Sequence, residues 1–110
     1  MLSLRAKRSN PSFRDMKQPA VYILANKKNG TLYVGVTSNL IQRVAQHREG
    51  HFDGFTARYG IKALVWWELC GTMESAILRE KQIKGGSRAA KIQLIVAMNP
   101  DWADLYDTLV

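Results

Sequence analysis

The sequence contains a single cysteine, three prolines and no long hydrophobic run. One thiol, Cys70, can neither close an internal disulfide nor supply a multi-thiolate zinc site. Because Cys70 follows the apolar run that ends in WWEL, we expect a small buried hydrophobe at this position rather than a nucleophile. No apolar segment approaches the roughly 20 residues that a membrane-spanning helix requires, so no membrane partner is expected.

The N-terminal segment lacks the apolar stretch and the small-residue cleavage site of a secretory signal, which makes a cytoplasmic location the expectation. Residues 1–19 instead combine Ser, Asn, Pro and basic residues without periodicity, as in a basic flexible tail. The alternatives are a nucleic-acid-binding arm and an extended start, since Met16 could equally open the chain. Residues 20–110 are predicted to form one domain, because a chain of 110 residues has no room for a second core.

Acidic residues are also scarce: 9 Asp and Glu face 16 Lys and Arg, which leaves a net charge of +7. This balance favours a polyanionic partner, DNA or RNA, and no small-molecule cofactor is expected. The excess is concentrated in residues 79–91, whereas the C-terminal residues are acidic. A solvated helix face that binds no ligand could carry the same basic residues. The residues predicted to bind nucleic acid in this stretch are Arg79, Lys81, Lys84, Arg88 and Lys91.

Two β-prone runs, VYILA at 21–25 and TLYVGV at 31–36, flank the turn signal Asn29-Gly30 and predict a β-hairpin. A two-residue turn would pair position 28 with 31, and a four-residue loop would pair 26 with 31. Because side chains alternate along a strand, both registers place Tyr22 and Tyr33 on the same face of the sheet.

The rest of the chain contains one more strand between helical and loop segments. Thr37 or Ser38 can cap a helix that ends at Gly50. Residues 50–62 predict a glycine-punctuated loop whose aromatic and cationic residues, Arg58 among them, could contact bases and phosphates or pin the loop to the core. The remaining expected elements are a strand at 63–69, a helix at about 73–84, a helix capped by Ser87 and a short helix after Asn99-Pro100. The order β-β-α-β-α-α-α predicts an α+β fold around a small antiparallel sheet.

One acidic residue departs from the pattern of the expected helix 73–84. Glu80 falls on the apolar face of this helix, which consists of Met73, Ala76, Ile77 and Ile83. A carboxylate in a buried stripe is unfavourable unless an ion pair or a metal ion compensates it. Glu80 is therefore a candidate metal ligand.

Phosphodiester hydrolysis would use the side chains that stand out: Tyr22, Tyr33, Arg43, His47 and Glu80. Arg43 and His47 are four residues apart and share one helix face. A divalent cation on one carboxylate, together with an arginine, can neutralise the charge that develops on the phosphate. A tyrosine near a cation can accept the proton of the attacking water. Taken singly, each residue also has an ordinary structural explanation as a core tyrosine, an exposed helix cation or a helix-terminal histidine.

The same positions resemble the motifs of the GIY-YIG nucleases over roughly residues 19–107. AVYIL matches the first motif, LYVGVT the second, and AILREKQIKG the segment of the metal-binding glutamate. The helix arginine lies ten residues after the second tyrosine, and the histidine follows four residues later. The matching residues are Tyr22, Tyr33, Gly35, Arg43, His47 and Glu80. The sequence is most similar to the stand-alone, single-domain bacterial branch of this family, which is related to the nuclease domain of the bacterial excinuclease.

The resemblance implies a three-stranded antiparallel sheet flanked by helices and a metal-dependent DNA endonuclease. It implies that Glu80 binds Mg²⁺ or Mn²⁺ and that Arg43 stabilises the phosphate charge. Tyr22, or alternatively Tyr33, would activate water with help from His47. Low sequence specificity on structured or damaged DNA, in repair or recombination, is expected because no second DNA-recognition domain is evident.

Three departures from the family pattern bear on rate and specificity. Ala20-Val21 replaces the Gly-Ile of the first motif, Val36 stands where some members carry a lysine, and the asparagine that some members carry after the glutamate helix is not evident in KGGSRAAK. The main alternative is a non-catalytic nucleic-acid-binding module that retains the fold. A protein-interaction domain is the third hypothesis.

Overall fold

The computed structural model describes residues 17–50 and 54–110. Residues 1–16 of the expected tail and residues 51–53 of the expected loop lie outside the described residues. The described chain forms a three-stranded antiparallel sheet in the order β2-β1-β3, with β1 at Ala20–Ala25, β2 at Leu32–Thr37 and β3 at Ala63–Leu69. The α+β fold with three antiparallel strands is confirmed.

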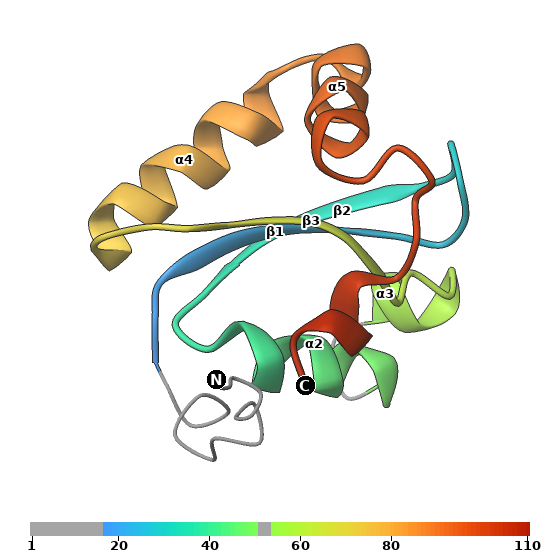
Figure 1. Cartoon of the computed structure of the whole chain (residues 1–110), viewed down its shortest axis with the longest axis horizontal. Helices are drawn as coiled ribbons and strands as arrows, with labels where there is room; N and C mark the ends of the chain where they lie inside the picture. The colour runs from blue at the N-terminus through green and yellow to red at the C-terminus, as the bar shows by residue number, and fades with distance from the viewer. Residues whose placement is uncertain (1–16, 51–53) are drawn as a thin grey trace, which may run out of the picture.

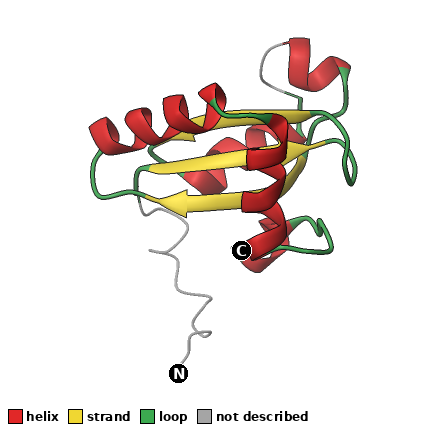
Figure 2. Ribbon diagram, turned by 90° about the horizontal axis from the view of Figure 1, so that it is seen from above, coloured by secondary structure: helices red, strands yellow, loops and turns green. Residues whose placement is uncertain are grey.

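Helices cover both faces of this sheet (Figure 1). Helices α4 (Met73–Gly85) and α5 (Arg88–Met98) lie on one face, and α2 (Leu40–Arg48) and the short α3 (Gly54–Arg58) lie on the other. Figure 2 shows α4 running along the direction of the strands. The C-terminal 3-10 helix η1 (Leu105–Thr108) returns to the α2 side. No helix in the described ranges is both long and apolar enough to cross a membrane.

The turn between β1 and β2 is a four-residue loop. The Asn26 amide donates to the Thr31 carbonyl oxygen over 3.3 Å, and inside the loop the Gly30 amide donates to the Lys27 carbonyl oxygen over 2.9 Å. Asn29 adopts the left-handed backbone conformation with a φ of 59°, which asparagine tolerates better than most residues. The turn signal therefore corresponds to the longer of the two loops considered.

This loop length sets the register of the hairpin. Tyr22 lies opposite Gly35, and Leu24 lies opposite Tyr33. Because alternate residues of a strand share a face, the two tyrosines lie on the same face of the sheet, as predicted.

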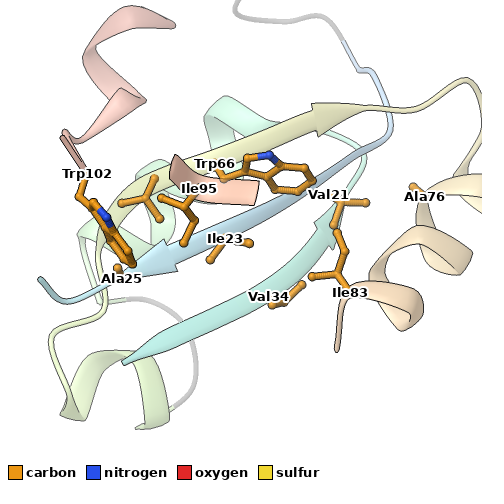
Figure 3. Close-up of a cluster of buried hydrophobic side chains, with 10 residues drawn as sticks. Val21, Ile23, Ala25, Val34, Trp66, Ala76, Ile83, Ile95 and Trp102 are labelled. Carbon is orange, nitrogen blue, oxygen red and sulfur yellow. The ribbon is translucent and has the colours of Figure 1, made fainter. Parts of the chain in front are cut away.

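Each face of the sheet buries a hydrophobic cluster. The cluster on the α4 and α5 side is shown in Figure 3, where Trp66 of β3 lies between the strands and the helices. Its other members include Val21, Ile23, Val34, Ala76, Ile83 and Ile95. The cluster on the α2 side contains Ala20, Tyr22, Leu24, Leu40, Ile41, Val44, Ile61 and Leu64. The two apolar faces explain why β1, the central strand, is buried at every position.

The predicted cap of α2 is wrong. Asn39 is the N-cap, and its side-chain oxygen accepts a hydrogen bond from the Gln42 amide. The Thr37 hydroxyl is buried and bonds the backbone of Asn39 instead, both as donor and as acceptor. Thr37 is the last residue of β2. Helix α2 begins at Leu40, two residues after the first helical position that a Thr37 cap would give.

Three further expectations are corrected by the structure. Part of the expected loop 50–62 is helix α3, which Thr56 anchors by its burial. The expected helix after Asn99-Pro100 does not form there, because Trp102 is buried and has a φ of 56°, and only η1 follows. Ile77 is 38% exposed, since α4 meets the sheet along a narrow line at Ala76 and Ile83.

Candidate active site

The phenol ring of Tyr22 lies across the neighbouring strand at Gly35. A Cβ atom built at Gly35 would come within 2.4 Å of both the Cζ and the hydroxyl oxygen of Tyr22. Any larger residue would therefore displace the ring. Since β2 is an edge strand, the ring extends from the central strand toward the outer edge of the sheet.

Helix α2 brings His47 to the Tyr22 hydroxyl. Leu40, Ile41 and Val44 are buried against the sheet, and His47 continues this stripe with only 2% of its surface exposed. The Tyr22 hydroxyl oxygen lies 3.0 Å from His47 Nε2, within hydrogen-bond distance. The sequence predicted that Arg43 and His47 share a face, and their positions on α2 bring both to the same phenol.

Tyr33 completes a group of three rings. Its centroid lies 6.4 Å from that of Tyr22 and 5.4 Å from that of His47, and the Tyr22 and His47 centroids are 5.9 Å apart. All three pairs are tilted or edge-on, the geometry that aromatic quadrupoles favour. Tyr22 has no exposed surface, whereas Tyr33 is only partly buried. Tyr33 is thus the ring of the group that reaches solvent.

The electrostatics of Tyr22 link the remaining two residues to the group. Burial raises the pKa of the Tyr22 phenol far above its ordinary value, and negative charge on Tyr33 and on Glu80 raises it further. The positive charge of Arg43 and its side-chain hydrogen bond to Tyr22 lower the pKa of the phenol. The other four residues predicted from the sequence therefore act on the Tyr22 hydroxyl group, His47 by its hydrogen bond and the rest as charged groups.

Glu80 acts on the Tyr22 phenol through its charge, from α4, which packs against β2 and β1 from the other face of the sheet. Its side chain is only 15% exposed, and its Oε2 atom lies 3.0 Å from the Nζ atom of Lys84, one helical turn later. The inward position that the helical pattern predicted is confirmed by this burial. The acid is compensated by an ion pair, one of the two solutions that the pattern left open.

The donor set allows a metal ion at Glu80. No three His, Cys, Asp or Glu side chains cluster in residues 17–50 and 54–110, so a metal there would have one protein carboxylate and several waters, an arrangement that Mg²⁺ accepts. The Lys84 ammonium already occupies the position of a cation beside Oε2. Because the Lys84 side chain is 54% exposed, it can swing into solvent and release the carboxylate.

The basic residues predicted to bind nucleic acid do not form one patch. Arg58 lies on α3, across the sheet from the other five. Arg79 pairs with Glu68 at 3.2 Å and lies 6.0 Å from the centre of the Trp66 ring. Lys84 pairs with Glu80, and the amine of Lys91 donates to the Gly86 carbonyl oxygen at 2.8 Å. Several of these cations therefore have structural partners, while Lys81 on α4 is exposed.

The hairpin turn adds basic residues that the sequence pattern identified only as part of a turn. Lys27 and Lys28 are both exposed. Arg88 of α5 donates from one guanidinium nitrogen to the carbonyl oxygens of Asn29 and Gly30, at 2.8 and 2.7 Å. The available signal was the adjacent pair of lysines in NKKNG, but only the fold places Lys27 beside α5.

Known proteins resemble this chain over most of its length. The family model described as the GIY-YIG catalytic domain matches residues 18–93. A UPF0213 protein from Syntrophus aciditrophicus is 37% identical over 87 residues, which cover 78% of this chain and 98% of the relative. A UPF0213 protein from Pseudomonas aeruginosa strain PAO1 is 33% identical over 75 residues, or 68% of this chain and 72% of the relative. The solution NMR structure of a UPF0213 protein from Bacillus halodurans shares 31% identity, covers 74% of this chain and 85% of that one, and superposes with a TM-score of 0.47.

Proposed function

The chain belongs to the GIY-YIG catalytic-domain family, a nuclease family, and from this premise we propose that it is a divalent-metal-dependent DNA endonuclease of low sequence specificity. The proposal is supported most strongly by the convergence of four residues on the Tyr22 phenol. Tyr22 hydrogen-bonds His47, lies beside Tyr33 and responds to the charges of Arg43 and Glu80. Such a set combines a proton acceptor, a cation and a carboxylate, which phosphodiester hydrolysis needs together.

Glu80 would hold the divalent cation, Mg²⁺ or Mn²⁺, after Lys84 has moved into solvent. When bound, the cation neutralises negative charge on the phosphate and on the departing oxygen. Arg43 would contribute a second positive charge at the phosphate. Both charges act in a site that burial partly shields from water, where they have more effect.

Tyr22 would accept the proton of the attacking water by a relay. A raised pKa means that the phenol is neutral near pH 7, so a stable phenolate is not available as the base. With the ring proton of His47 on Nδ1, the phenol donates its own hydrogen to Nε2 across the 3.0 Å contact as it takes the proton of water. No isolated buried anion is formed, which is the physical advantage of the relay.

The bond changes balance without any further reactant. The water oxygen forms a bond to phosphorus while the bond from phosphorus to the departing oxygen breaks. The water proton passes to Tyr22, the phenolic hydrogen passes to His47, and the departing oxygen takes a proton from solvent. The relay then runs in reverse and returns the proton of His47 to solvent, which closes the balance. Since Arg43 hydrogen-bonds Tyr22 in the free protein, its movement toward the phosphate would open the phenol oxygen to water. Tyr33, which is partly exposed, is the alternative base.

Low specificity follows from the kind of contact that the surface offers. Exposed cations such as Lys81 and Arg58 would contact phosphates, which position DNA but carry no sequence information. Structured or damaged DNA, whose backbone is accessible at flaps and junctions, is the proposed substrate.

Cleavage assays with a matched pair of variants test the proposal. Labelled linear, flapped and four-way DNA, with RNA counterparts, are incubated with the protein with and without Mg²⁺ or Mn²⁺. Wild type should cleave at least one DNA substrate only with metal, Glu80→Gln should bind DNA without cleaving it, and Glu74→Gln, an exposed glutamate of the same helix, should cleave normally. A wild type that cuts nothing with either metal rejects catalysis, and equal cleavage by Glu80→Gln removes that residue from the mechanism.

The ion pair between Glu80 and Lys84 is what favours the second candidate, a non-catalytic nucleic-acid-binding module. If Lys84 replaces the metal permanently, DNA association should be strongly salt-dependent and indifferent to divalent cations other than as salt. Metal-dependent cleavage would exclude this candidate.

A further inference from the structure

A groove of about 690 Å³ lies between the β1–β2 turn and α5, on the α4 and α5 side of the sheet. Turn residues between 26 and 32 form one wall, and Arg88 and Lys91 form the other. The groove is separate from the ring cluster of Tyr22, Tyr33 and His47, which lies on the opposite face.

Three cations line this groove: Lys27, Arg88 and Lys91. No Asp or Glu lines it within the described part of the chain. Arg88 and Lys91 hydrogen-bond backbone carbonyl oxygens, which hold the side chains in place but leave their charges unneutralised. Arg88 uses one nitrogen of its guanidinium for both of its bonds to the turn, and the group has five N–H donors in all. The groove therefore presents fixed positive charge and spare donors to an anion.

A purely structural role explains only part of this arrangement. Arg88 ties the turn to α5 through Asn29 and Gly30, and that alone would account for its position. It does not account for Lys27, which is exposed on the wall opposite Arg88, or for the absence of acidic residues from the described lining. Like charges gathered without counter-charges are unfavourable for folding, and an anionic ligand relieves the repulsion.

Strand β2 connects the groove to the proposed active site. Leu32 lines the groove, and the next residue, Tyr33, belongs to the ring cluster on the other face. Because β2 is an edge strand, its outer edge leads from one site to the other. A nucleic-acid strand carries a phosphate at every nucleotide, so a strand that crosses the outer edge of β2 can place one phosphate near Arg43 and another in the groove.

We propose that this groove binds a backbone phosphate of the nucleic-acid substrate, a short distance along the strand from the bond to be cut. The position relative to the cut bond rests on the proposed nuclease function, whereas phosphate binding in the groove does not.

The test compares neighbouring lysines. Binding of a labelled DNA duplex is measured by fluorescence anisotropy at a series of salt concentrations, in Glu80→Gln protein so that the DNA stays intact. Lys27→Ala should weaken binding and reduce the slope of log affinity against log salt by about 0.9, as expected for one lost phosphate contact. Lys27→Arg should restore the slope. Lys28→Ala removes the same charge from the adjacent exposed residue, which does not line the groove, and should leave the slope unchanged.

A second measurement separates the sources of phosphate. Inorganic phosphate is titrated into wild type while amide NMR shifts of the turn and of α5 are followed, and the DNA duplex is then added as a competitor. Displacement of phosphate by DNA supports the proposal. Phosphate binding that DNA does not displace would assign the groove to free phosphate and overturn it, as would equal salt slopes for Lys27→Ala and Lys28→Ala.

The outcomes also separate the groove from the nuclease. Metal-dependent cleavage with a salt slope that Lys27→Ala does not change rejects the groove and keeps the enzyme. A salt slope that Lys27→Ala does reduce, in a protein that never cleaves DNA, rejects the enzyme and keeps the phosphate site.

Discussion

The Tyr22 ring lies over Gly35, its partner on the neighbouring strand, so closely that a single added carbon would come within 2.4 Å of the phenol. The glycine of the second motif is thus a steric requirement of the tyrosine of the first. Without it, the Tyr22 hydroxyl could not lie 3.0 Å from His47.

Gly35→Ala should therefore damage both stability and cleavage. We expect the free energy of unfolding to fall by about 1–3 kcal/mol, as for other overpacked sites, and cleavage to fall with it because the ring is displaced from His47. Urea unfolding and initial cleavage rates are the measurements. Gly54→Ala is the control, since a Cβ at Gly54 meets nothing within 4 Å. In a double-mutant cycle, Tyr22→Ala should abolish most of the effect of Gly35→Ala on stability; purely additive effects would contradict the steric explanation.

Tyr22→Phe and His47→Gln should each reduce cleavage by roughly 10²- to 10⁴-fold, the range of general acid–base catalysis. Because the two groups form one relay, the double variant should be little worse than either single variant. Single-turnover rates with saturating metal test this. Near-normal cleavage by Tyr22→Phe, with Tyr33→Phe inactive, would transfer the role of base to Tyr33.

Lys84→Ala should increase the affinity for Mg²⁺, because it removes the ammonium that competes for Glu80. Because the Lys84 end of this ion pair is exposed, the pair should contribute about 0.2–1 kcal/mol, so the gain should be at most about fivefold. Isothermal titration calorimetry measures it. Lys81→Ala removes an exposed charge from the residue that follows Glu80 in the same helix and is the matched control. An equal gain in Mg²⁺ affinity in both variants would indicate a general charge effect.

The free energy of unfolding should depend on pH in the alkaline range, because Tyr22 is buried. Its pKa is raised in the folded protein, so above the ordinary tyrosine value of about 10 the unfolded chain loses the phenolic proton first. The contribution of Tyr22 is fully present below about pH 10 and is lost as pH rises, by about 1.4 kcal/mol per pH unit. Urea unfolding at about pH 9, 10 and 11 should show a shallower decline for Tyr22→Phe than for wild type. The half-exposed Tyr59 provides the control variant, Tyr59→Phe, which should follow wild type.

Asn39→Ala should destabilise the protein by about 0.5–2 kcal/mol, the usual effect of losing an N-cap. Asn39 caps the helix that carries Arg43 and His47, so the cleavage rate should also fall. Ser38→Ala, at a position that the sequence alone favoured as the cap, should be neutral because Ser38 is exposed and outside the cap contacts. Chemical denaturation of both variants decides between the two residues.

Local patterns in the sequence were sufficient for the main elements. Alternating and apolar runs predicted β1, β2 and β3, and the Asn29-Gly30 signal predicted the hairpin, because these features depend on residues close together in the chain. The sequence pattern did not predict the segments whose backbone conformation depends on which side chains are buried. Helix α3 is short, and the chain at Trp102 takes a left-handed conformation as its side chain enters the core.

For the site, the motif spacing identified Tyr22 and the four residues that converge on it, and the helical stripe placed Glu80 inward. The sequence could not predict in the same way which basic side chains are available to bind nucleic acid. Arg79 is held by Glu68, Arg88 by the hairpin turn and Lys91 by Gly86. These partners are distant in sequence or depend on a loop, so composition reported only the sum of the charges.

The order of the strands and of the longer helices, the family and the chemical identity of the site residues could all be read from the amino-acid sequence, since side-chain types and short-range periodicity are encoded locally. Two contacts instead required the folded chain: the Tyr22 hydroxyl meets Nε2 of His47, and Lys27 faces α5 across a groove. The geometry of each depends on how the two faces of the sheet are packed, and packing is a property of the whole chain.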